Sequence, residues 1–416
     1  MKGMNFLFLL SIIFFVIVNR IYTEEKLPEE LKLLWEKELE CSENVGCIPQ
    51  LCFFDKYNNR LVIIGTSYLV KGDIKSDLGG KFLMWEINPE NGEEIKKVVI
   101  KEIPPIMKRS NLIGYDIIGE GVNLLPNGDF YLVGRFDDIQ QSLVKIDKNG
   151  KVTPINSVFP QTFQKIILIT KVLSFFDNSF LLLGKSDMDN FMIKVDKEGN
   201  KIWEKKLSPN IGKIGGILKD GILMSNKEDF LVVGEFPREF KIFGPSDIWL
   251  VWCDNKGNIL SEEIFPGRDL HLCKLASGEI VVVYDASQSD NINNRDYKFR
   301  IYNSQLKLLL ESQVAKGVLI FPLNIKTISK NRFVIVGCAS TLSEDNTQMI
   351  IEMYDKEGKK LYSCNRKEGI FCGSLKICGD EDRLFLVTLS EFQTIKNSNQ
   401  NEKMKFKVKI LCYQLK

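Results

Sequence analysis

An apolar segment recurs seven times at nearly even spacing, and this repeat restricts the possible folds more than any other feature. The segments are rich in β-branched and aromatic residues and end at Gly65, Gly134, Gly184, Gly234, Tyr284, Gly337 and Thr388. Successive segments lie 50 to 53 residues apart, except for a first interval of 69 that contains an insertion around 101–121. Segments of this composition between turn residues indicate β-strands, whereas helical repeats would show a period of 3.6 residues.

A second motif, an apolar strand followed by a tight turn and another strand, comes after several of these segments. In four copies an aspartate stands three residues before a glycine, as in Asp147 and Gly150, Asp196 and Gly199, Asp254 and Gly257, and Asp355 and Gly358. Aspartate accepts backbone hydrogen bonds at the first position of a turn, and glycine supplies the positive φ. Each turn has too few carboxylates for a calcium loop, so we interpret the motif as a hairpin turn.

The two ends of the chain complement each other. A further strand precedes each apolar segment, which gives four strands in each repeat of about 50 residues, the size of a β-propeller blade. The last repeat ends after its third strand (405–416), and residues 31–40 resemble a fourth strand, with Trp35 in the place of Trp203. We therefore expect an all-β chain: a seven-bladed β-propeller of four-stranded blades, with residues 31–416 as a single domain and the last blade closed by the N-terminal strand. An open solenoid, or six or eight blades, is the alternative.

The repeat pattern D/N-G-x-F-L-V-V-G, followed by W-L-V-K-V-D-x-x-G-N-x-x-W-x-K, resembles the exported bacterial β-propellers of the quinoprotein-like and delta-60 repeat type over residues 31–416. The resemblance implies the architecture and leaves the activity open, since such repeats occur in dehydrogenases, assembly scaffolds and adhesins. Residues 85–95 resemble one degenerate tryptophan-docking motif in which Ile95 stands where a tryptophan is expected. We therefore expect neither pyrroloquinoline quinone nor any other cofactor.

The N-terminal segment has the pattern of an export signal. Lys2 precedes an apolar run over 6–18, too short to span a bilayer comfortably, so residues 1–23 are interpreted as a signal peptide. The segment lacks a small-residue cleavage site, which leaves an uncleaved N-terminal anchor and membrane attachment as the alternative. We expect a secreted, periplasmic or cell-surface protein.

Charge and histidine content argue against several functions. Lys and Arg total 56 against 54 Asp and Glu, so no strong field attracts nucleic acid. The single histidine, His271, disfavours Ser-His-Asp and Cys-His arrangements and histidine-rich metal sites. His271 could face the channel beside Arg268 and Asp269 as an acid or base, although a structural role is the more common one. We expect no metal site and name no catalytic residue.

The ten cysteines are even in number and include no C-x-x-C pair. In an exported chain they predict disulfides or buried thiols, with a pairing that the sequence does not define. The five tryptophans fall on predicted outer strands, where packing between blades is a better interpretation than stacking on sugars.

The predicted ligand site lies on the loop face, where the sequence varies most. Arg135, Lys185, Glu235 and Asp285 directly follow the second strand of four repeats, and Asp137 and Asp187 lie in the same loops. We expect an exported, monomeric, non-catalytic binding module for a protein, peptide or glycan at these six residues. The alternatives are loops without a ligand, or a secreted hydrolase, lyase or quinone enzyme with loop carboxylates at the channel mouth.

Overall fold

The computed structural model describes most of the chain after residue 30. The described ranges are 31–39, 45–69, 80–103, 123–137, 140–155, 167–186, 189–209, 216–224, 228–238, 244–288, 295–316, 319–320, 324–329, 331–340, 348–366, 370–380, 382–390, 393–396, 402–405 and 407–415. The predicted export signal (1–23) and most of the predicted insertion around 101–121 lie outside these ranges. Within them, no helix has the length and apolar character needed to cross a membrane.

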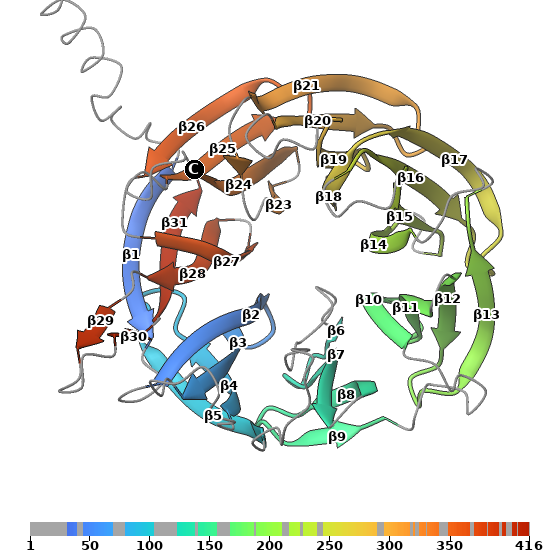
Figure 1. Ribbon diagram of the computed structural model, residues 1–416. Helices are drawn as coiled ribbons and strands as arrows, with labels where there is room; N and C mark the ends of the chain where they lie inside the picture. The colour runs from blue at the N-terminus through green and yellow to red at the C-terminus, as the bar shows by residue number, and fades with distance from the viewer. Residues whose placement is uncertain are drawn as a thin grey trace, which may run out of the picture.

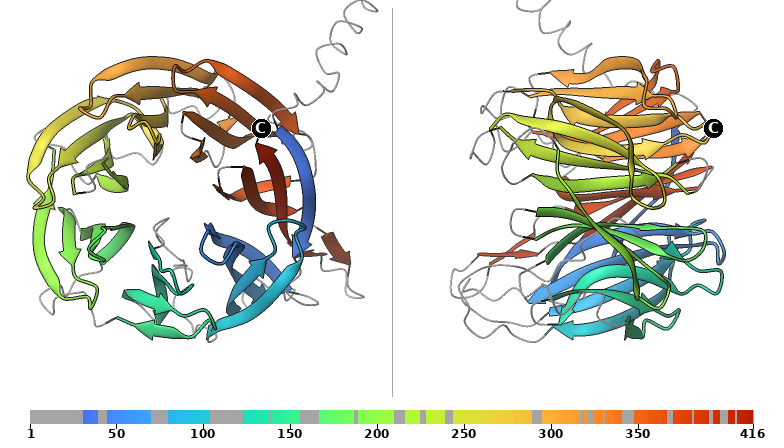
Figure 2. Two further views of the ribbon diagram at one scale, coloured as in Figure 1. Left: turned by 180° about the vertical axis from the view of Figure 1, so that it is seen from behind. Right: turned by 90° about the vertical axis from the view of Figure 1, so that its right-hand side faces the viewer.

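Seven antiparallel sheets follow one another around a central axis, as the sequence predicted (Figures 1 and 2). The first blade contains β2 (Val45–Asp55), β3 (Arg60–Leu69), β4 (Gly80–Ile87) and β5 (Glu94–Ile103). The second contains β6 (Asn123–Leu124), β7 (Phe130–Asp137), β8 (Gln140–Ile146) and β9 (Val152–Pro154). The third contains β10 (Ile167–Ser174), β11 (Phe180–Ser186), β12 (Asp189–Val195) and β13 (Lys201–Leu207).

The remaining blades keep the same order from the axis outward. The fourth contains β14 (Ile217–Leu223), β15 (Phe230–Pro237), β16 (Ser246–Cys253) and β17 (Ile259–Pro266). The fifth contains β18 (Arg268–Lys274), β19 (Ile280–Asp285), β20 (Asp296–Tyr302) and β21 (Leu308–Lys316). In the sixth, β22 (Leu319–Ile320) and β23 (Asn324–Ser329) both pair with β24 (Arg332–Ser340), followed by β25 (Gln348–Asp355) and β26 (Lys360–Arg366).

The seventh blade is assembled from both ends of the chain. It contains β27 (Ile370–Gly379), β28 (Arg383–Ser390), β31 (Val408–Leu415) and, as its outer strand, β1 (Leu31–Leu39). The pairing of β1 with β31 is antiparallel and runs from Leu31 opposite Leu415 to Leu39 opposite Val408. The predicted ring closure by the N-terminal strand is thus confirmed (Figure 1). A small hairpin, β29 (Gln393–Lys396) with β30 (Glu402–Lys405), projects between β28 and β31.

The hydrophobic core is divided into seven clusters, one between each pair of neighbouring blades. The cluster between the seventh blade and the first contains Trp85, Phe385 and Cys412 and joins residues from opposite ends of the sequence. Because each blade buries both of its faces, its second strand is apolar throughout, and this is the recurring signal in the sequence.

The predicted turns are present and also connect neighbouring blades. At Gly257, with φ of 75°, the amide donates to the Asp254 carbonyl at 2.9 Å. A Cβ at this position would lie 3.0 Å from the ring of Trp203, which belongs to the preceding blade. Trp35 covers Gly92 in the same way, so the contact that links interior blades also links the seventh blade to the first. These glycines are required both by their backbone conformation and by a close side-chain approach.

Candidate functional site: a lysine-lined axial cavity

The inner strands bring corresponding residues to the axis. In six blades, one residue of the inner strand pairs with the next-to-last residue of the apolar segment on the second strand. These six residues therefore occupy equivalent positions around the axis: Leu51, Lys171, Asp220, His271, Asn324 and Lys376. In the first, third, fourth, fifth and seventh blades the register shifts just before this position. Such a bulge redirects the side chain that follows it.

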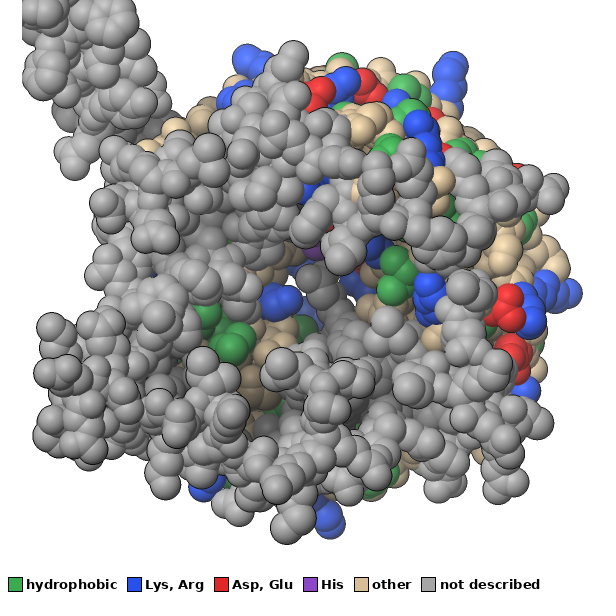
Figure 3. All heavy atoms as spheres, viewed as in Figure 1, with side chains coloured by type: hydrophobic (Ala, Val, Ile, Leu, Met, Phe, Trp, Pro, Cys, Tyr) green, Lys and Arg blue, Asp and Glu red, His purple; other side chains and the backbone are tan. Residues whose placement is uncertain are grey.

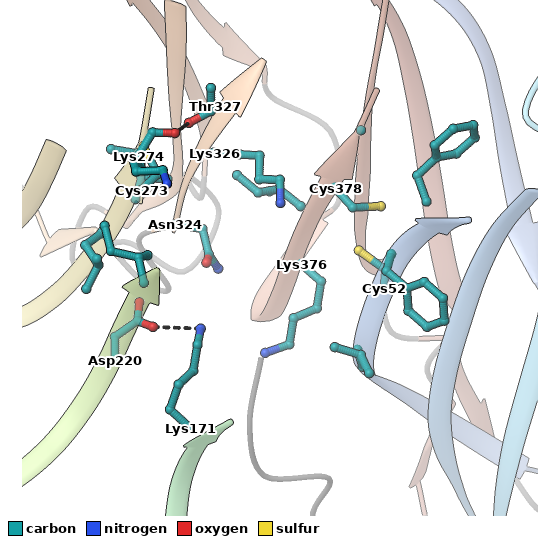
Figure 4. A pocket seen from close by; sticks show the side chains of 18 residues that line it. Cys52, Lys171, Asp220, Cys273, Lys274, Asn324, Lys326, Thr327, Lys376 and Cys378 are labelled. Carbon is teal, nitrogen blue, oxygen red and sulfur yellow. Dashed lines mark hydrogen bonds and ion pairs between the residues drawn. The ribbon is translucent and has the colours of Figure 1, made fainter. Parts of the chain in front are cut away.

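A cavity of about 440 Å³ lies among these inner strands (Figure 4). Strands β2, β10, β14, β18, β23 and β27, from six blades, contribute to its wall. Four lysines line it, namely Lys171, Lys274, Lys326 and Lys376, and Asp220 is the one acidic residue among its lining residues. Lysine or arginine atoms are visible at the central opening of the ring in the space-filling view (Figure 3). The cavity therefore carries an excess of positive charge.

The four lysines differ in their surroundings. The Lys171 ammonium lies 2.6 Å from the Asp220 carboxylate, which balances one charge. The Lys274 Nζ donates to the Leu223 carbonyl at 2.7 Å, and burial lowers the pKa of this lysine. Lys326 and Lys376 have no carboxylate partner within the described part of the chain. These two ammonium groups are the ones available to a ligand.

Neutral polar groups and aromatic rings complete the wall. The Asn324 amide nitrogen donates to the Leu375 carbonyl at 2.9 Å, and the Thr327 hydroxyl donates to the Lys274 carbonyl at 2.8 Å. Phe53 and Phe54, on β2, line the side that belongs to the first blade. The cavity thus combines cations and fixed polar atoms with an apolar surface, the composition typical of small-molecule sites.

The predicted loop-face residues occupy equivalent positions, although their surroundings differ. Lys185 lies opposite Asn190, Glu235 opposite Ile248 and Asp285 opposite Tyr297, each directly after the apolar part of its strand. Burial lowers the pKa of Lys185, and Glu235 forms an ion pair with Lys219. Arg135 and Asp137 belong to β7, their side chains lying outside the description, and Asp187 lies outside the described residues.

Asp285 holds a buried charge cluster. Its side chain is fully buried, and its carboxylate accepts from the Arg268 Nε at 2.9 Å, from Arg295 and from the Ser287 hydroxyl. Burial by itself would raise the pKa of Asp285, but the hydrogen bonds from Arg295 and Arg268 outweigh it, so the pKa of Asp285 is lowered. The described contacts of Asp285 are thus structural, and a role for the loop-face residues in ligand binding stays a prediction.

His271 lies within β18, at one of the six equivalent register positions, and is half-buried. Arg268, predicted beside it at the channel, is buried in the Asp285 cluster instead. Among the described residues no group of three or more metal-ligating side chains is gathered. The cysteines form both of the predicted kinds, since Cys47 is disulfide-bonded and six others are free thiols: Cys52, Cys253, Cys273, Cys364, Cys378 and Cys412.

Sequence reasoning missed the lysines of the cavity. A signal was present, because each of five consecutive inner strands carries a lysine, at Lys171, Lys219, Lys274, Lys326 and Lys376. These lysines recur at roughly the blade interval. This pattern can be recognised only after the inner strands have been identified, because a single lysine in a strand does not indicate a site.

The fold and the cavity define a seven-bladed β-propeller with a basic axial site. No protein-family model matches the chain, and no curated protein matches it. Among solved structures, the polysaccharide lyase Uly1 is similar over 92% of this chain and 100% of its own, with a TM-score of 0.55 and 8% identity.

Two hydrolases also match. Puromycin hydrolase has a TM-score of 0.50 and 8% identity over 82% of this chain and 50% of its own. An acylaminoacyl peptidase from Pyrococcus horikoshii has a TM-score of 0.47 and 14% identity over 86% and 50%. The chain therefore spans about half the length of these two hydrolases. At such identities the likeness concerns the fold alone.

Proposed function

We propose that the protein is an exported, non-catalytic binding module whose axial cavity takes an acidic saccharide. The observation that carries this proposal is the pair of lysines, Lys326 and Lys376, which line the cavity without a described carboxylate partner. Lys326 is exposed and Lys376 is half-buried, so an anionic ligand in the cavity can reach both ammonium groups and balance their charge.

A saccharide fits the rest of the wall better than an extended peptide does. The Asn324 amide and the Thr327 hydroxyl stand beside the lysines and offer groups suited to sugar hydroxyls. Phe53 and Phe54 supply the apolar surface against which a sugar face packs. A carboxylate or sulfate on the sugar would then lie between Lys326 and Lys376, and the ring hydroxyls would reach the neutral polar groups.

Calorimetric titration with a uronic-acid oligosaccharide tests the proposal, with its carboxyl-reduced analogue and an oligoglutamate as competitors. We expect Lys326→Met and Lys376→Met each to weaken binding about tenfold, because each removes one charge-assisted contact of about 1.5 kcal/mol. Lys307→Met, in the exposed turn between β20 and β21, is the matched control and should leave affinity unchanged.

Three results would contradict the proposal. Equal affinity for the carboxyl-reduced saccharide would show that the charge is irrelevant to binding. Preferential binding of oligoglutamate would replace the saccharide with an acidic peptide as the ligand. Wild-type affinity in the Lys326→Met, Lys376→Met double variant would show that the saccharide does not bind at these lysines of the cavity.

A second candidate function is a lyase that acts on the same class of ligand. Its basis is Lys274, whose pKa is lowered by burial, so that a larger fraction of it than of an exposed lysine is in the neutral form that can act as a general base. In this reaction Lys274 would remove the proton α to a uronate carboxylate that Lys326 neutralises. The C–O bond β to that carboxylate would then break to give the carbon–carbon double bond, and the leaving oxygen would take the proton held by Lys274. Absorbance of the unsaturated product, lost in Lys274→Met, distinguishes the lyase from a binding module.

Three further predictions belong to this proposal. We propose export through residues 1–23, membership of the quinoprotein-like or delta-60 type of repeat propeller, and a contribution to binding from the loop-face residues around Arg135 and Lys185. The mature N-terminus, determined by mass spectrometry, tests the first of these.

A further inference from the structure

We propose that Cys52 and Cys378 form a reversible disulfide that joins the first blade covalently to the seventh. The pair lies where the ring closes, at the wall of the axial cavity. This inference is independent of the proposed ligand, because it concerns two thiols and an oxidant and requires no lysine.

The geometry brings the two thiols together. Cys52 belongs to β2 and Cys378 to β27, the inner strands of the first and seventh blades, which lie side by side (Figure 1). Both residues belong to the apolar cluster between these blades, and their side chains are hydrogen-bonded to each other. Figure 4 shows the two sulfur atoms directed toward one another across the gap between the strands. Two thiols in contact need little movement to reach disulfide geometry.

The cavity gives an oxidant access to the pair. Cys52 is 8% exposed and Cys378 is 3% exposed, and both line the axial cavity. A small disulfide entering the cavity therefore meets Cys52 first. Burial raises the pKa of Cys378, so this thiol is mostly protonated and reacts slowly with oxidants from solvent. Its reaction partner is therefore the mixed disulfide that forms on Cys52.

The chain already contains an oxidised cysteine on the same strand. Cys47 is disulfide-bonded and lies on β2, the strand that also carries Cys52. Structural disulfides form in oxidising compartments, where small disulfides are available as exchange partners. An environment that oxidises Cys47 therefore also supplies the oxidant for its neighbour on the strand.

The exchange proceeds in two balanced steps. The Cys52 thiolate attacks a low-molecular-weight disulfide, forming a mixed disulfide and releasing one small thiolate. Cys378 then gives its proton to the small thiolate released in the first step and attacks Sγ of Cys52, forming the Cys52–Cys378 bond and releasing the second small thiolate. The two protons from the protein thiols pass to the two small thiolates. One small disulfide is reduced to two thiols, and two protein thiols are oxidised.

The new bond would add a covalent link to the closure that the pairing of β1 with β31 and the packing between the first and seventh blades already make. It would link residues near opposite ends of the sequence and so constrain nearly the whole ring in the unfolded state. We expect the oxidised protein to unfold several degrees above the reduced protein. We also expect Cys52→Ser and Cys378→Ser to abolish this redox-dependent difference.

The experiment equilibrates the full folded chain with oxidised or reduced glutathione, blocks free thiols with an alkylating reagent under denaturing conditions, and maps peptides by mass spectrometry. We expect a Cys52–Cys378 cross-linked peptide, the loss of two alkylated thiols, and recovery of both with a dithiol reductant. Cys253→Ser, which removes a buried free thiol of the fourth blade, is the matched control and should leave the cross-link intact.

The proposal is overturned if Cys52 and Cys378 are both alkylated after oxidation, or if either is found bonded to another cysteine such as Cys412. Should one serine variant fail to fold, as judged by circular dichroism, the other variant and the wild-type peptide map still decide the question. Saccharide binding need not be measured, so this result stands apart from the test of the proposed function.

Discussion

Replacing Trp35 tests the physical basis of ring closure. Trp35 lies on β1, its indole donates to the Pro89 carbonyl at 3.0 Å, and its ring covers Gly92 and packs against Phe385 at 6.1 Å between centroids. The side chain is half-buried, so truncation to alanine should cost about 2 kcal/mol in packing, below the range for a fully buried tryptophan. Loss of the hydrogen bond adds about 1 kcal/mol. We therefore expect Trp35→Ala to lower the free energy of unfolding by about 3 kcal/mol.

Urea denaturation followed by far-ultraviolet circular dichroism measures this loss without depending on tryptophan fluorescence. Trp35→Phe keeps a ring over Gly92 and loses the indole donor, so it should cost roughly 1 kcal/mol. Trp203→Ala is the matched comparison inside the chain, because Trp203 donates to the Asn255 carbonyl at 3.1 Å and covers Gly257. It should cost a similar amount. A loss below about 1 kcal/mol for Trp35→Ala, with a normal loss for Trp203→Ala, would refute the view that closure uses the same contact as the interior blades.

Two further predictions concern stability. Gly257→Ala should lower the free energy of unfolding by about 1–2 kcal/mol, because φ is 75° there and the new Cβ would lie 3.0 Å from Trp203. In a double-mutant cycle with Trp203→Ala, the two losses should be less than additive. Strict additivity would contradict the contact between the two residues. Asp285→Asn should cost about 3–5 kcal/mol at neutral pH, since it removes the buried carboxylate shared by Arg268 and Arg295 and leaves Arg295 only the longer ion pair with Asp269 at 3.6 Å. Because the folded-state pKa of Asp285 is lowered, its contribution to the free energy of unfolding is present above the unfolded pKa of about 3.9 and is lost as pH falls below it. Urea midpoints measured from neutral to acid pH should therefore fall more steeply in the wild type than in the variant. Parallel curves would argue against the ion cluster.

Local chemistry explains why the fold could be predicted from the sequence. The apolar segments that end at Gly134, Gly184 and Gly234 are second strands buried on both faces, so their composition alone identifies them. The turns were identifiable because Asp254 and Gly257 each have one local task, accepting backbone hydrogen bonds and adopting a positive φ. Trp35 could be matched with Trp203 because the outer strands β1 and β13 each place a tryptophan over the turn glycine of the next blade.

The candidate site could not be predicted in the same way. The sequence directed attention to the loop face, where charged residues follow each second strand, and the register there is as expected. It gave no indication that Arg268 and Arg295 both turn toward Asp285, since these pairings depend on how two neighbouring strands are placed. A contact between residues that are distant in sequence cannot be predicted from the local pattern around either residue.

The order of strands, the blade count and the use of residues near 31–39 to complete the last blade were determined by the sequence itself, because each follows from repeating local patterns and from one missing strand. Only the tertiary structure decided that Lys326 and Lys376 share a cavity and that the thiols of Cys52 and Cys378 meet. The physical reason is circular closure: it brings inner strands from distant parts of the chain to one axis, and the convergence of their side chains there depends on bulges and register that no single repeat encodes.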